Sequence, residues 1–484
     1  ATLNGFAPLD LESEFTYCEL GCGNGVSTAA LAQLFPKGQF IGADFSAEHV
    51  ENGTQLAEDA GLGNVSFAEV DFNDLADHDL PDFDFITLHG VYAWIDPETR
   101  EGLRQFFDHK LKPGGFLYVS YNAMPGWSAI GPLREMVLAA TLEMDADPIT
   151  KMQSGLDYLN YMKEREAGYF ADNPPAAAFV EEISTLDPHY LVHEFFVDFV
   201  KPYYFYQVAG EMRSIGLHFV GNAEISLNFL DLAAPTDFHK RLSEASTRIA
   251  FEGEGDFIRN QRFRRDLYCK GKESLDEEAQ RAVLCQTPFG TSHAWEIFSL
   301  EARFGEVEIN YQSPVFEALI DSLSRSAKSV EALKDGPGFE DYTPDLLIDG
   351  IKFLSAGNQL MPFARPTRET SGKDLEAQCF ALPTGFNLAM LKRRLFKSDN
   401  LALAAPAAGI GLEVGMADAL YALCLVEAPS GQVAEWAFQR SIEAGQQIVS
   451  DDGDEQGALE DAVDVFRETR LAKFIELGIL EPAE

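Results

Sequence analysis

Short apolar runs alternate with segments of helical spacing over the first 122 residues of the chain. Five of the runs have the length and composition of buried strands: TYCEL, QFIGAD, VSFAEV, FDFITL and GGFLYVSYN. Helical spacing fills the segments between them, and Ser46 as an N-cap, Gly61 as a stop and Pro97 as a first residue mark helix ends. Strands that alternate with helices predict a doubly wound α/β sheet of parallel strands.

The following residues are expected to complete this sheet after an interruption. In residues 211–230, EMRSIGLHFVGNAEISLNFL reads as a helix followed by two strands. Residues 132–200 have helical spacing and are interpreted as a helical insertion that forms a lid or a dimer contact. We therefore assign the sheet domain to residues 1–131 and 201–235, and a middle, regulatory region to residues 236–311.

The remaining sequence reads as two smaller domains. Residues 312–366 contain SPVFEALIDSLSRS, SVEALKDG and PDLLIDGIKFLSAGNQLMPF, which resemble the helices of a winged helix. From Ser313 to Arg365 there are five Lys and Arg residues against eight Asp and Glu residues, which favours a structural or protein-docking module over a DNA-recognition helix. Residues 367–484 are expected to be mainly helical, with a mobile acidic loop, SDDGDEQGALED, at 450–461.

The composition narrows the class of function. A chain of 484 residues with 46% hydrophobic residues is expected to form several folded domains. Its 37 Lys and Arg residues against 78 Asp and Glu residues give a net charge of −41, which argues against a nucleic-acid partner. Two short basic clusters are interpreted as solvated helix faces or internal salt bridges: Arg262, Arg264 and Arg265, and Lys392, Arg393, Arg394 and Lys397.

The distribution of cysteines and of apolar residues indicates the cellular compartment in which the protein is expected. The six cysteines are scattered without a CxxC pair, so we expect neither a disulfide framework nor a metal site. No signal-peptide pattern opens the chain, although it starts at Ala1 without a methionine. The longest uncharged apolar stretch, LALAAPAAGIGL at 401–412, is too short and too rich in Gly and Pro to span a bilayer. These features predict a cytoplasmic protein without membrane insertion.

A glycine-rich turn follows the first predicted strand and opens the first predicted helix. In the run Glu19-Leu20-Gly21-Cys22-Gly23-Asn24-Gly25, the glycines can adopt tight-turn dihedral angles and let a ligand approach the backbone. Asp44 ends the second strand, where a carboxylate can accept hydrogen bonds from ribose hydroxyls. Asp71 ends the third strand and precedes Phe72, a candidate adenine contact. The spacing differs from a dinucleotide site, because Thr28 stands where the third glycine of that motif belongs.

This ExGxGxG turn, with acidic residues after the second and third strands, resembles the class I S-adenosylmethionine (AdoMet) methyltransferases. Three further stretches are similar to bacterial methyltransferases with a methyltransferase regulatory domain, a family that includes outer-membrane-protein lysine methyltransferases. They are HGVYAW at 89–94, VSYNAMPGW at 119–127, and YLVHEFF at 190–196 followed by PYYFYQVAGEMRSIGLHFVG at 202–221. The resemblance covers residues 4–270 well and the remainder loosely.

The resemblance implies a Rossmann-like, seven-stranded sheet domain. It also implies AdoMet as cofactor, S-adenosylhomocysteine (AdoHcy) as product and N-methylation of lysine side chains in a protein acceptor. The residues that it assigns to the cofactor are Glu19, Gly21, Cys22, Gly23, Asn24, Gly25, Asp44, Phe45, Asp71, Phe72, His89 and Gly90. The candidate catalytic residues are Tyr92, Trp94, His193 and Glu194.

Alternatives remain open for the catalytic candidates and for the acceptor. Tyr92 and Trp94 either wall the acceptor channel, where their ring faces stabilise a cationic amine, or pack against the next helix. The pair His193 and Glu194 either acts on the acceptor or secures the helical insertion. A small-molecule methyltransferase would share the same first domain, and a regulatory protein with a degenerate site would bind little cofactor.

Overall fold

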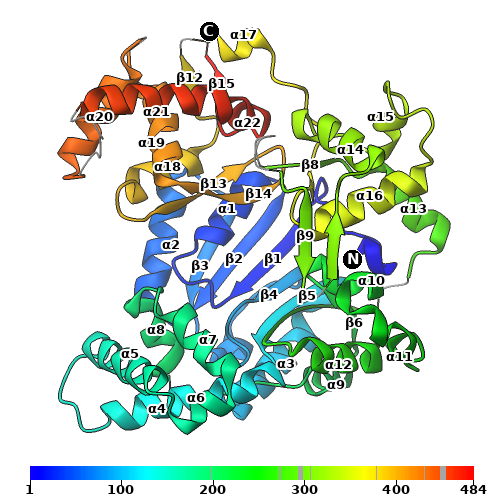
Figure 1. Ribbon diagram of the computed structural model, residues 1–484, viewed down its shortest axis with the longest axis vertical. Coiled ribbons are helices and arrows are strands. Elements are labelled where there is room, and N and C mark those ends of the chain that lie inside the picture. The colour runs from blue at the N-terminus through cyan, green and yellow to red at the C-terminus, as the bar shows by residue number, and fades with distance from the viewer. Residues whose placement is uncertain are drawn as a thin grey trace.

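The computed structural model of the protein describes residues 1–197, 199–271, 274–292, 298–305, 307–377, 379–429, 431–446 and 454–483. Within these residues, seven strands form one central sheet in the order β3-β2-β1-β4-β5-β7-β6 (Figure 1). Strands β1 to β5 run parallel, and β7 lies antiparallel between β5 and β6. The strands are β1 Phe15–Leu20, β2 Gly38–Asp44, β3 Val65–Glu69, β4 Phe83–Leu88, β5 Leu111–Asn122, β6 Leu217–Asn222 and β7 Phe263–Lys270. The predicted Rossmann-like α/β sheet is confirmed.

Helices cover both faces of the sheet because the strands alternate their apolar side chains. Phe15 of β1 packs against Ala32 of α1 on one face, whereas Leu20 of the same strand packs with Phe107 of α3 on the other. Ser46 caps α2 as predicted by accepting a hydrogen bond from the His49 N–H. The helices on the sheet are α1 Val26–Leu34, α2 Ala47–Asp59, α3 Pro97–Lys110 and α9 Phe205–Ser214.

The predicted second strand of residues 211–230 is wrong. After α9 and β6, the segment ISLN forms a 3-10 helix, η4 (Ile225–Asn228), followed by the short helix α10 (Leu230–Ala233). The last strand to join the sheet is instead β7, which lies inside the region assigned to residues 236–311. Its sequence, FRRDLYCK, carries four charged residues and therefore does not have the pattern of a buried strand.

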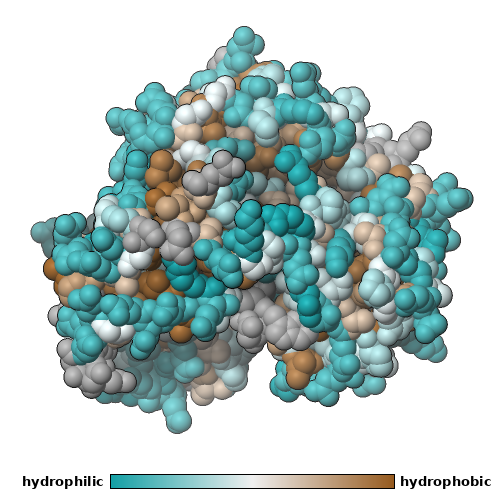
Figure 2. Space-filling view, turned by 90° about the horizontal axis from the view of Figure 1, so that it is seen from above, coloured by the Kyte–Doolittle hydropathy of each residue, from teal (hydrophilic) through white to brown (hydrophobic). Residues whose placement is uncertain are grey.

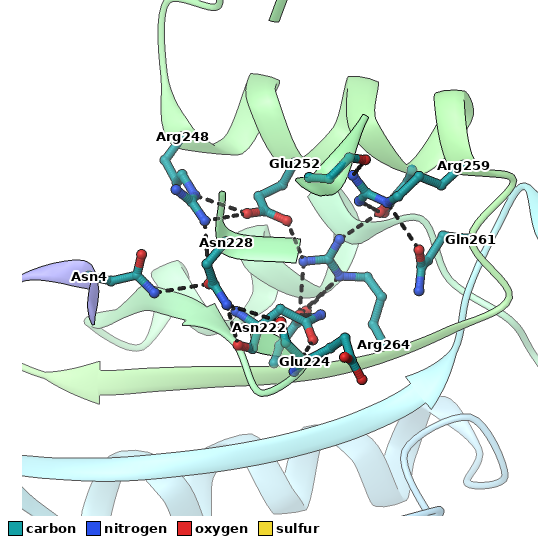
Figure 3. Close-up of polar contacts among 12 residues, drawn as sticks. Asn4, Asn222, Glu224, Asn228, Arg248, Glu252, Arg259, Gln261 and Arg264 are labelled. Carbon is teal, nitrogen blue, oxygen red and sulfur yellow. Dashed lines mark hydrogen bonds and ion pairs between the residues drawn. The ribbon is translucent and has the colours of Figure 1, made fainter. Parts of the chain in front are cut away.

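Two of those charges, on Arg264 and Asp266, are buried in an ion network between β7 and helix α12 (Arg248–Arg259), shown in Figure 3, whereas Arg265 is exposed. The side chain of Arg264 is fully buried, and its guanidinium lies 2.6–2.9 Å from three carboxylates, those of Glu252, Asp256 and Asp266. Arg248 pairs with Glu252 at 2.7 Å, and Arg259 pairs with Asp256 at 3.1 Å. Three arginines thus balance three carboxylates. The predicted internal salt bridge is confirmed for Arg264.

The predicted helical insertion between β5 and α9 is confirmed. Its five helices share a hydrophobic core of their own, which includes Val137, Leu156, Val180 and Leu191. Figure 1 shows them beside one another at the lower left, past the ends of the parallel strands. The helices are α4 Gly131–Thr141, α5 Pro148–Glu164, α6 Gly168–Asp172, α7 Pro174–Ile183 and α8 Pro188–Phe195.

A third hydrophobic cluster lies in the winged-helix-like segment. The three predicted helices are present as α14 Pro314–Arg325, α15 Val330–Lys334 and α16 Pro344–Ala356. The strands near them are short pairs, β8 with β11 and β9 with β10, so the winged-helix assignment stays a prediction. The other elements of this region are α11 His239–Ser243, α13 Glu277–Gln286, β8 Phe289–Gly290, β9 Glu301–Phe304, β10 Val307–Asn310 and β11 Met361–Pro362.

The C-terminal domain is mainly helical, as predicted, and packs on the sheet domain. Its core contains Ala29 and Leu56 from the sheet-covering helices α1 and α2 together with Phe386 and Leu403. The helices are α17 Gly372–Leu375, α18 Gly385–Arg394, α19 Met416–Glu427, α20 Val433–Glu443, α21 Glu455–Thr469 and α22 Leu471–Glu476. The strands are β12 Phe380–Ala381, β13 Asn400–Ala405, β14 Ile410–Gly415 and β15 Glu481–Pro482.

The structure places the apolar stretch of this domain and corrects one expectation, that of an acidic loop. The apolar stretch at 401–412 forms most of the hairpin of β13 and β14. The predicted acidic loop at 450–461 lies partly outside the described residues, and from Glu455 onward it is helix α21 rather than loop.

Figure 2 shows a mainly hydrophilic face with hydrophobic side chains in small separate groups. Among the described residues, no helix is long and apolar enough to cross a bilayer.

Candidate functional site

The carboxyl ends of the parallel strands lie level with one another. Leu20 at the end of β1 is in register with Ala43 of β2 and with Leu88 of β4, and Leu88 is in register with Val119 of β5. The segments that follow these strands therefore meet at one edge of the sheet. In open α/β sheets this edge is where ligands bind.

The glycine loop after β1 depends on glycine at three positions. Gly21, Gly23 and Gly25 have φ angles of 72°, 53° and 70°, in the left-handed region that favours glycine. A Cβ atom on Gly21 would lie 2.8 Å from Val91, and one on Gly25 would lie 2.4 Å from Phe67. A Cβ atom on Gly23 would meet no atom within 4 Å. Gly23 therefore has open space beside its backbone, as a ligand-facing glycine requires.

Asp44 at the end of β2 holds this loop in place. Its carboxylate accepts hydrogen bonds from the N–H groups of Gly23, at 2.9 Å, and Ser46, at 3.0 Å. The Nδ1 atom of His49 lies 3.1 Å from the same carboxylate. A carboxylate has about four acceptor positions, so these contacts leave room for about one more donor. The hydrogen bond from a ribose hydroxyl to Asp44 stays a prediction. The structure shows that Asp44 also holds the loop backbone.

Two other predicted cofactor residues support the loop from inside. Burial raises the pKa of Glu19, although a hydrogen bond from the Thr28 hydroxyl favours its charged form. Thr28, which replaces the third glycine of a dinucleotide motif, is thus the partner of Glu19. The side chain of Cys22 is buried, and its N–H donates to the carbonyl of Ala43. The assignment of Cys22 to the cofactor site stays a prediction, and its buried side chain leaves the backbone as the part that a ligand could approach.

The residues after β2 and β3 are open to a ligand. The side chain of Phe45 is 75% exposed, which is unusual for an aromatic ring next to a buried strand. Asp71 is exposed and accepts hydrogen bonds from Asn73, and Phe72 beside it is half-buried. Asn24 of the loop accepts a hydrogen bond from Asn52 at 3.0 Å. An exposed aromatic face, an exposed carboxylate and an open glycine loop fit an adenosine group.

The end of β4 leads from this edge into a pocket. His89 lies 2.9 Å from the Tyr118 hydroxyl and 3.0 Å from the Ser120 hydroxyl through its Nδ1 atom. Burial and the nearby charge of Arg265 lower the pKa of His89. Gly90 has a φ angle of 67°, and a Cβ atom there would meet no atom within 4 Å. Both residues line the pocket.

The pocket has a volume of about 570 Å³ and lies between the carboxyl ends of β4 and β5, the start of β7 and the helical insertion. Its aromatic lining includes Trp94, Trp127, Phe179, Phe195 and Phe263. The charged residues in its wall are Arg134, Glu182, Glu194 and Arg262, of which Glu182 and Arg262 pair at 3.1 Å. The pocket thus combines five aromatic rings with aliphatic side chains and balanced charge.

Comparison with known proteins agrees with this geometry. A family model of a methyltransferase domain matches residues 11–160, and a model described as a predicted methyltransferase regulatory domain matches residues 187–270. Uncharacterized protein sll1526 of Synechocystis sp. is 29% identical over 486 residues, covering 99% of this chain and 94% of that protein. Uncharacterized protein RP028 of Rickettsia prowazekii is 30% identical over 211 residues, covering 42% of this chain and 81% of that protein.

A solved structure has the same fold over the whole chain. PKMT2 from Rickettsia typhi in complex with AdoHcy matches with a TM-score of 0.74 and 19% identity, covering 100% of this chain and 96% of that chain. The chain therefore contains a methyltransferase domain followed by a methyltransferase regulatory domain. It is an AdoMet-dependent methyltransferase. That the glycine loop, Phe45 and Asp71 bind its cofactor stays a prediction.

Tyr92, one of the catalytic candidates of this methyltransferase, lies in the core and not in the pocket. Tyr92 is 0% exposed and donates a hydrogen bond from its hydroxyl to Glu211 at 2.5 Å. Its ring packs against Tyr121 and Tyr203 in the sheet core. The prediction that Tyr92 walls the acceptor channel is therefore wrong, because no ligand can reach it. The packing alternative holds for this residue.

The structure places two of the remaining candidates of the methyltransferase in the pocket. Trp94 follows β4 and Glu194 lies on α8, and both line it. The side chain of His193 lies outside the described part of the structure. Sequence reasoning missed several pocket residues, namely Asn122, Trp127, Arg134, Phe179, Arg262 and Phe263. Only Asn122 and Trp127 had a signal, as members of the VSYNAMPGW motif.

Proposed function

We propose that this methyltransferase transfers a methyl group to the side-chain amine of lysine residues in a protein acceptor. The observation that carries the proposal is the aromatic pocket of about 570 Å³ that begins at His89 and Gly90, next to the cofactor edge. Its lining of rings suits the alkyl chain and cationic head of a lysine side chain.

The protonation of the amine decides what the pocket must do. A free lysine has a pKa of about 10.4, so removing its proton at pH 7 costs about 4.6 kcal/mol. Taking the ammonium out of water lowers its pKa and so reduces this cost. The rings of Trp94, Trp127 and Phe263 line the pocket and would reduce the water around a bound amine, while Glu194 is the proposed partner that orients the amine.

The residues of the chain contribute mainly positioning. When bound, AdoMet supplies an electrophilic methyl group on a sulfonium centre. Gly23, Asp71 and Phe45 would hold the adenosine group, and His89 and Gly90 would contact the methionine part. Holding a nucleophile in line for such a displacement accounts for much of the rate enhancement in enzymes, so the pocket walls need to be rigid.

The other parts of the chain have proposed roles in acceptor binding. Helices α7 and α8 of the insertion contribute Phe179, Glu182 and Glu194 to the pocket, so the insertion is suited to act as a lid. The predicted dimer contact through residues 132–200, the cytoplasmic location and the absence of a nucleic-acid partner stay predictions. We assign the winged-helix-like module and the C-terminal domain to recognition of the acceptor protein.

A small-molecule acceptor is the second candidate. Pockets of about 300–1,000 Å³ are typical of small-molecule sites, and the volume of this pocket falls within that range. Against it stands the likeness over the full chain length to PKMT2, whose name denotes a protein lysine methyltransferase. The two acceptors differ in size, so one experiment separates them.

The experiment incubates the enzyme with methyl-labelled AdoMet and a cell extract, then separates proteins from small molecules. The proposal predicts label in proteins, and mass spectrometry should locate it on lysine residues. A parallel incubation with Trp94→Ala should lose this label, whereas Leu142→Ala, at an exposed position outside the pocket, should retain it. Label confined to metabolites would support the small-molecule acceptor instead.

A further inference from the structure

Two buried donor groups in the pocket wall have no hydrogen-bond partner among the described residues. They are the Nδ2 group of Asn122 and the Nε group of Arg134. Both residues line the acceptor pocket, and Asn122 is only 6% exposed. Folded proteins pair nearly all of their buried donors, so two unpaired donors in one pocket call for a physical reason.

The two residues that carry these donors are held by other contacts. Asn122 is paired with Phe263 of β7 in the sheet, and its carbonyl accepts a hydrogen bond from the Tyr203 N–H at 2.9 Å. The guanidinium of Arg134 pairs with Glu135 at 3.1 Å and also donates to the carbonyl of Val197. The backbone of Asn122 and the rest of the Arg134 guanidinium are therefore held in place, and the two donors are left without a partner in the described part of the structure.

The chemistry of the wall decides which ligand group fits. Two unpaired N–H donors require an acceptor oxygen on the ligand. The charges in the wall balance, with Arg134 and Arg262 against Glu182 and Glu194, so a carboxylate would add an uncompensated charge. A neutral carbonyl oxygen, as in a peptide main chain, adds none. The torsion that rotates an Asn carboxamide is broad, so Asn122 can turn its donor toward such an oxygen at small cost.

We propose that Asn122 and Arg134 bind main-chain carbonyl oxygens of the peptide that carries the methylated lysine. The inference rests on the proposed lysine acceptor and adds a specificity. The pocket distinguishes a lysine within a peptide from a free alkyl amine, because only the peptide offers oxygens to the two donors. Asn122 is thus a binding residue for the acceptor backbone.

The direct test observes the Asn122 side chain by NMR. The full-length protein, selectively labelled with ¹⁵N-asparagine and saturated with AdoHcy, is titrated with Nα-acetyl-L-lysine methylamide or with n-pentylamine. The Asn122→Leu variant, which lacks the signal, assigns it. The amide-bearing probe is expected to shift the Asn122 side-chain resonances. The alkyl amine, which has no carbonyl oxygen, is expected to leave them in place.

The same variant tests affinity and stability. A hydrogen bond to a buried donor without another partner is worth about 1–3 kcal/mol, so Asn122→Leu should bind the amide probe roughly 5- to 150-fold more weakly. Its affinity for n-pentylamine should not change. The unfolding temperature of the ligand-free variant should stay or rise, since an apolar group replaces a donor that has no partner.

Asn387 provides a matched control. It is fully buried, and its carboxamide donates to the Ala404 carbonyl at 3.0 Å and accepts from the Ala404 N–H at 2.7 Å. Asn387→Leu should therefore lower the unfolding temperature and leave the affinity for both probes unchanged. The opposite signs of the two stability effects separate a ligand-binding asparagine from a structural one.

The inference is overturned if saturating amide probe leaves the Asn122 signal in place, if that probe does not bind, or if Asn122→Leu weakens both probes equally. Failure of the proposed function has a different signature. If the amide probe binds and shifts Asn122, yet no methyl-lysine forms from labelled AdoMet, recognition of a carbonyl oxygen stands and lysine methylation does not.

Discussion

Replacing Trp94 by alanine tests whether this residue forms a wall of the proposed acceptor pocket or only packs the fold. Trp94 is half-buried and lines the pocket, whereas Tyr92, two residues earlier, is completely buried. Removing the indole leaves the acceptor without one wall. A displacement of reacting atoms by about 1 Å can cost on the order of 100-fold in rate, so we expect a loss of that size in methyl transfer. Affinity for AdoMet should stay within a few-fold.

The effect of Trp94→Ala on stability should be small. Removing a fully buried Trp costs about 3–5 kcal/mol, and a half-buried one that faces a pocket should cost less than that. Tyr92→Phe is the matched control in the same turn. It removes the hydroxyl that donates to Glu211, a bond to a charged group worth about 1.5–3 kcal/mol. This control should therefore lower the unfolding temperature and leave the transfer rate of the folded enzyme unchanged.

Three measurements on each variant decide the question: unfolding temperature, calorimetric affinity for AdoHcy, and the single-turnover rate with the protein acceptor found by labelling. Trp94→Phe, which retains an aromatic wall, should recover part of the rate. A Trp94→Ala enzyme that is destabilised but transfers methyl groups at the normal rate would refute the reasoning. It would mean that Trp94, like Tyr92, serves only to pack the fold.

Three further predictions concern the cofactor edge, the ion network and the winged-helix-like module. Asp44→Ala removes the acceptor for the N–H groups of Gly23 and Ser46, so AdoMet affinity should fall by roughly 10- to 150-fold; unchanged calorimetric affinity in folded protein would contradict this. Burial raises the pKa of Asp256 to about 6, so wild-type stability falls as pH rises from about 4 to about 6, and Asp256→Asn should become more stable relative to wild type by about 2 kcal/mol between pH 4 and pH 8. A difference in denaturation free energy that does not change with pH would argue against it. The winged-helix-like module carries more acidic than basic residues, so the protein should not bind duplex DNA at physiological salt, and a salt-sensitive gel shift would disprove this.

Local patterns were enough to predict the sheet domain up to β5. Each strand there is a short apolar run, and each helix has its own start or stop residue, such as Ser46 and Gly61. Strand β7 could not be found in this way. Its residues Arg264 and Asp266 are buried only because helix α12 supplies Glu252 and Asp256, which lie 8 to 14 positions earlier in the chain. Charge pairing through tertiary contacts thus hides a buried strand from a hydrophobicity pattern.

The same distinction applies to the candidate site. The glycine loop and the residues after β2 and β3 follow from spacing, because a turn and a strand end are local features. The pocket is not local, since Trp94, Phe179 and Arg262 come from three distant segments. Nor does the sequence tell which aromatic residue of HGVYAW faces inward. The ring of Tyr92 packs against those of Tyr121 and Tyr203 in the core. Trp94 instead lines the pocket.

Identification of the methylated amino acid tests the proposed lysine acceptor most directly. Protein from an incubation with methyl-labelled AdoMet is hydrolysed in acid, and the label is followed by amino-acid chromatography. We predict that the label elutes with Nε-methylated lysines and that Trp94→Ala lowers its amount about 100-fold. Label that elutes with another amino acid, or that is released as methanol from carboxyl methyl esters, would contradict lysine methylation by this enzyme.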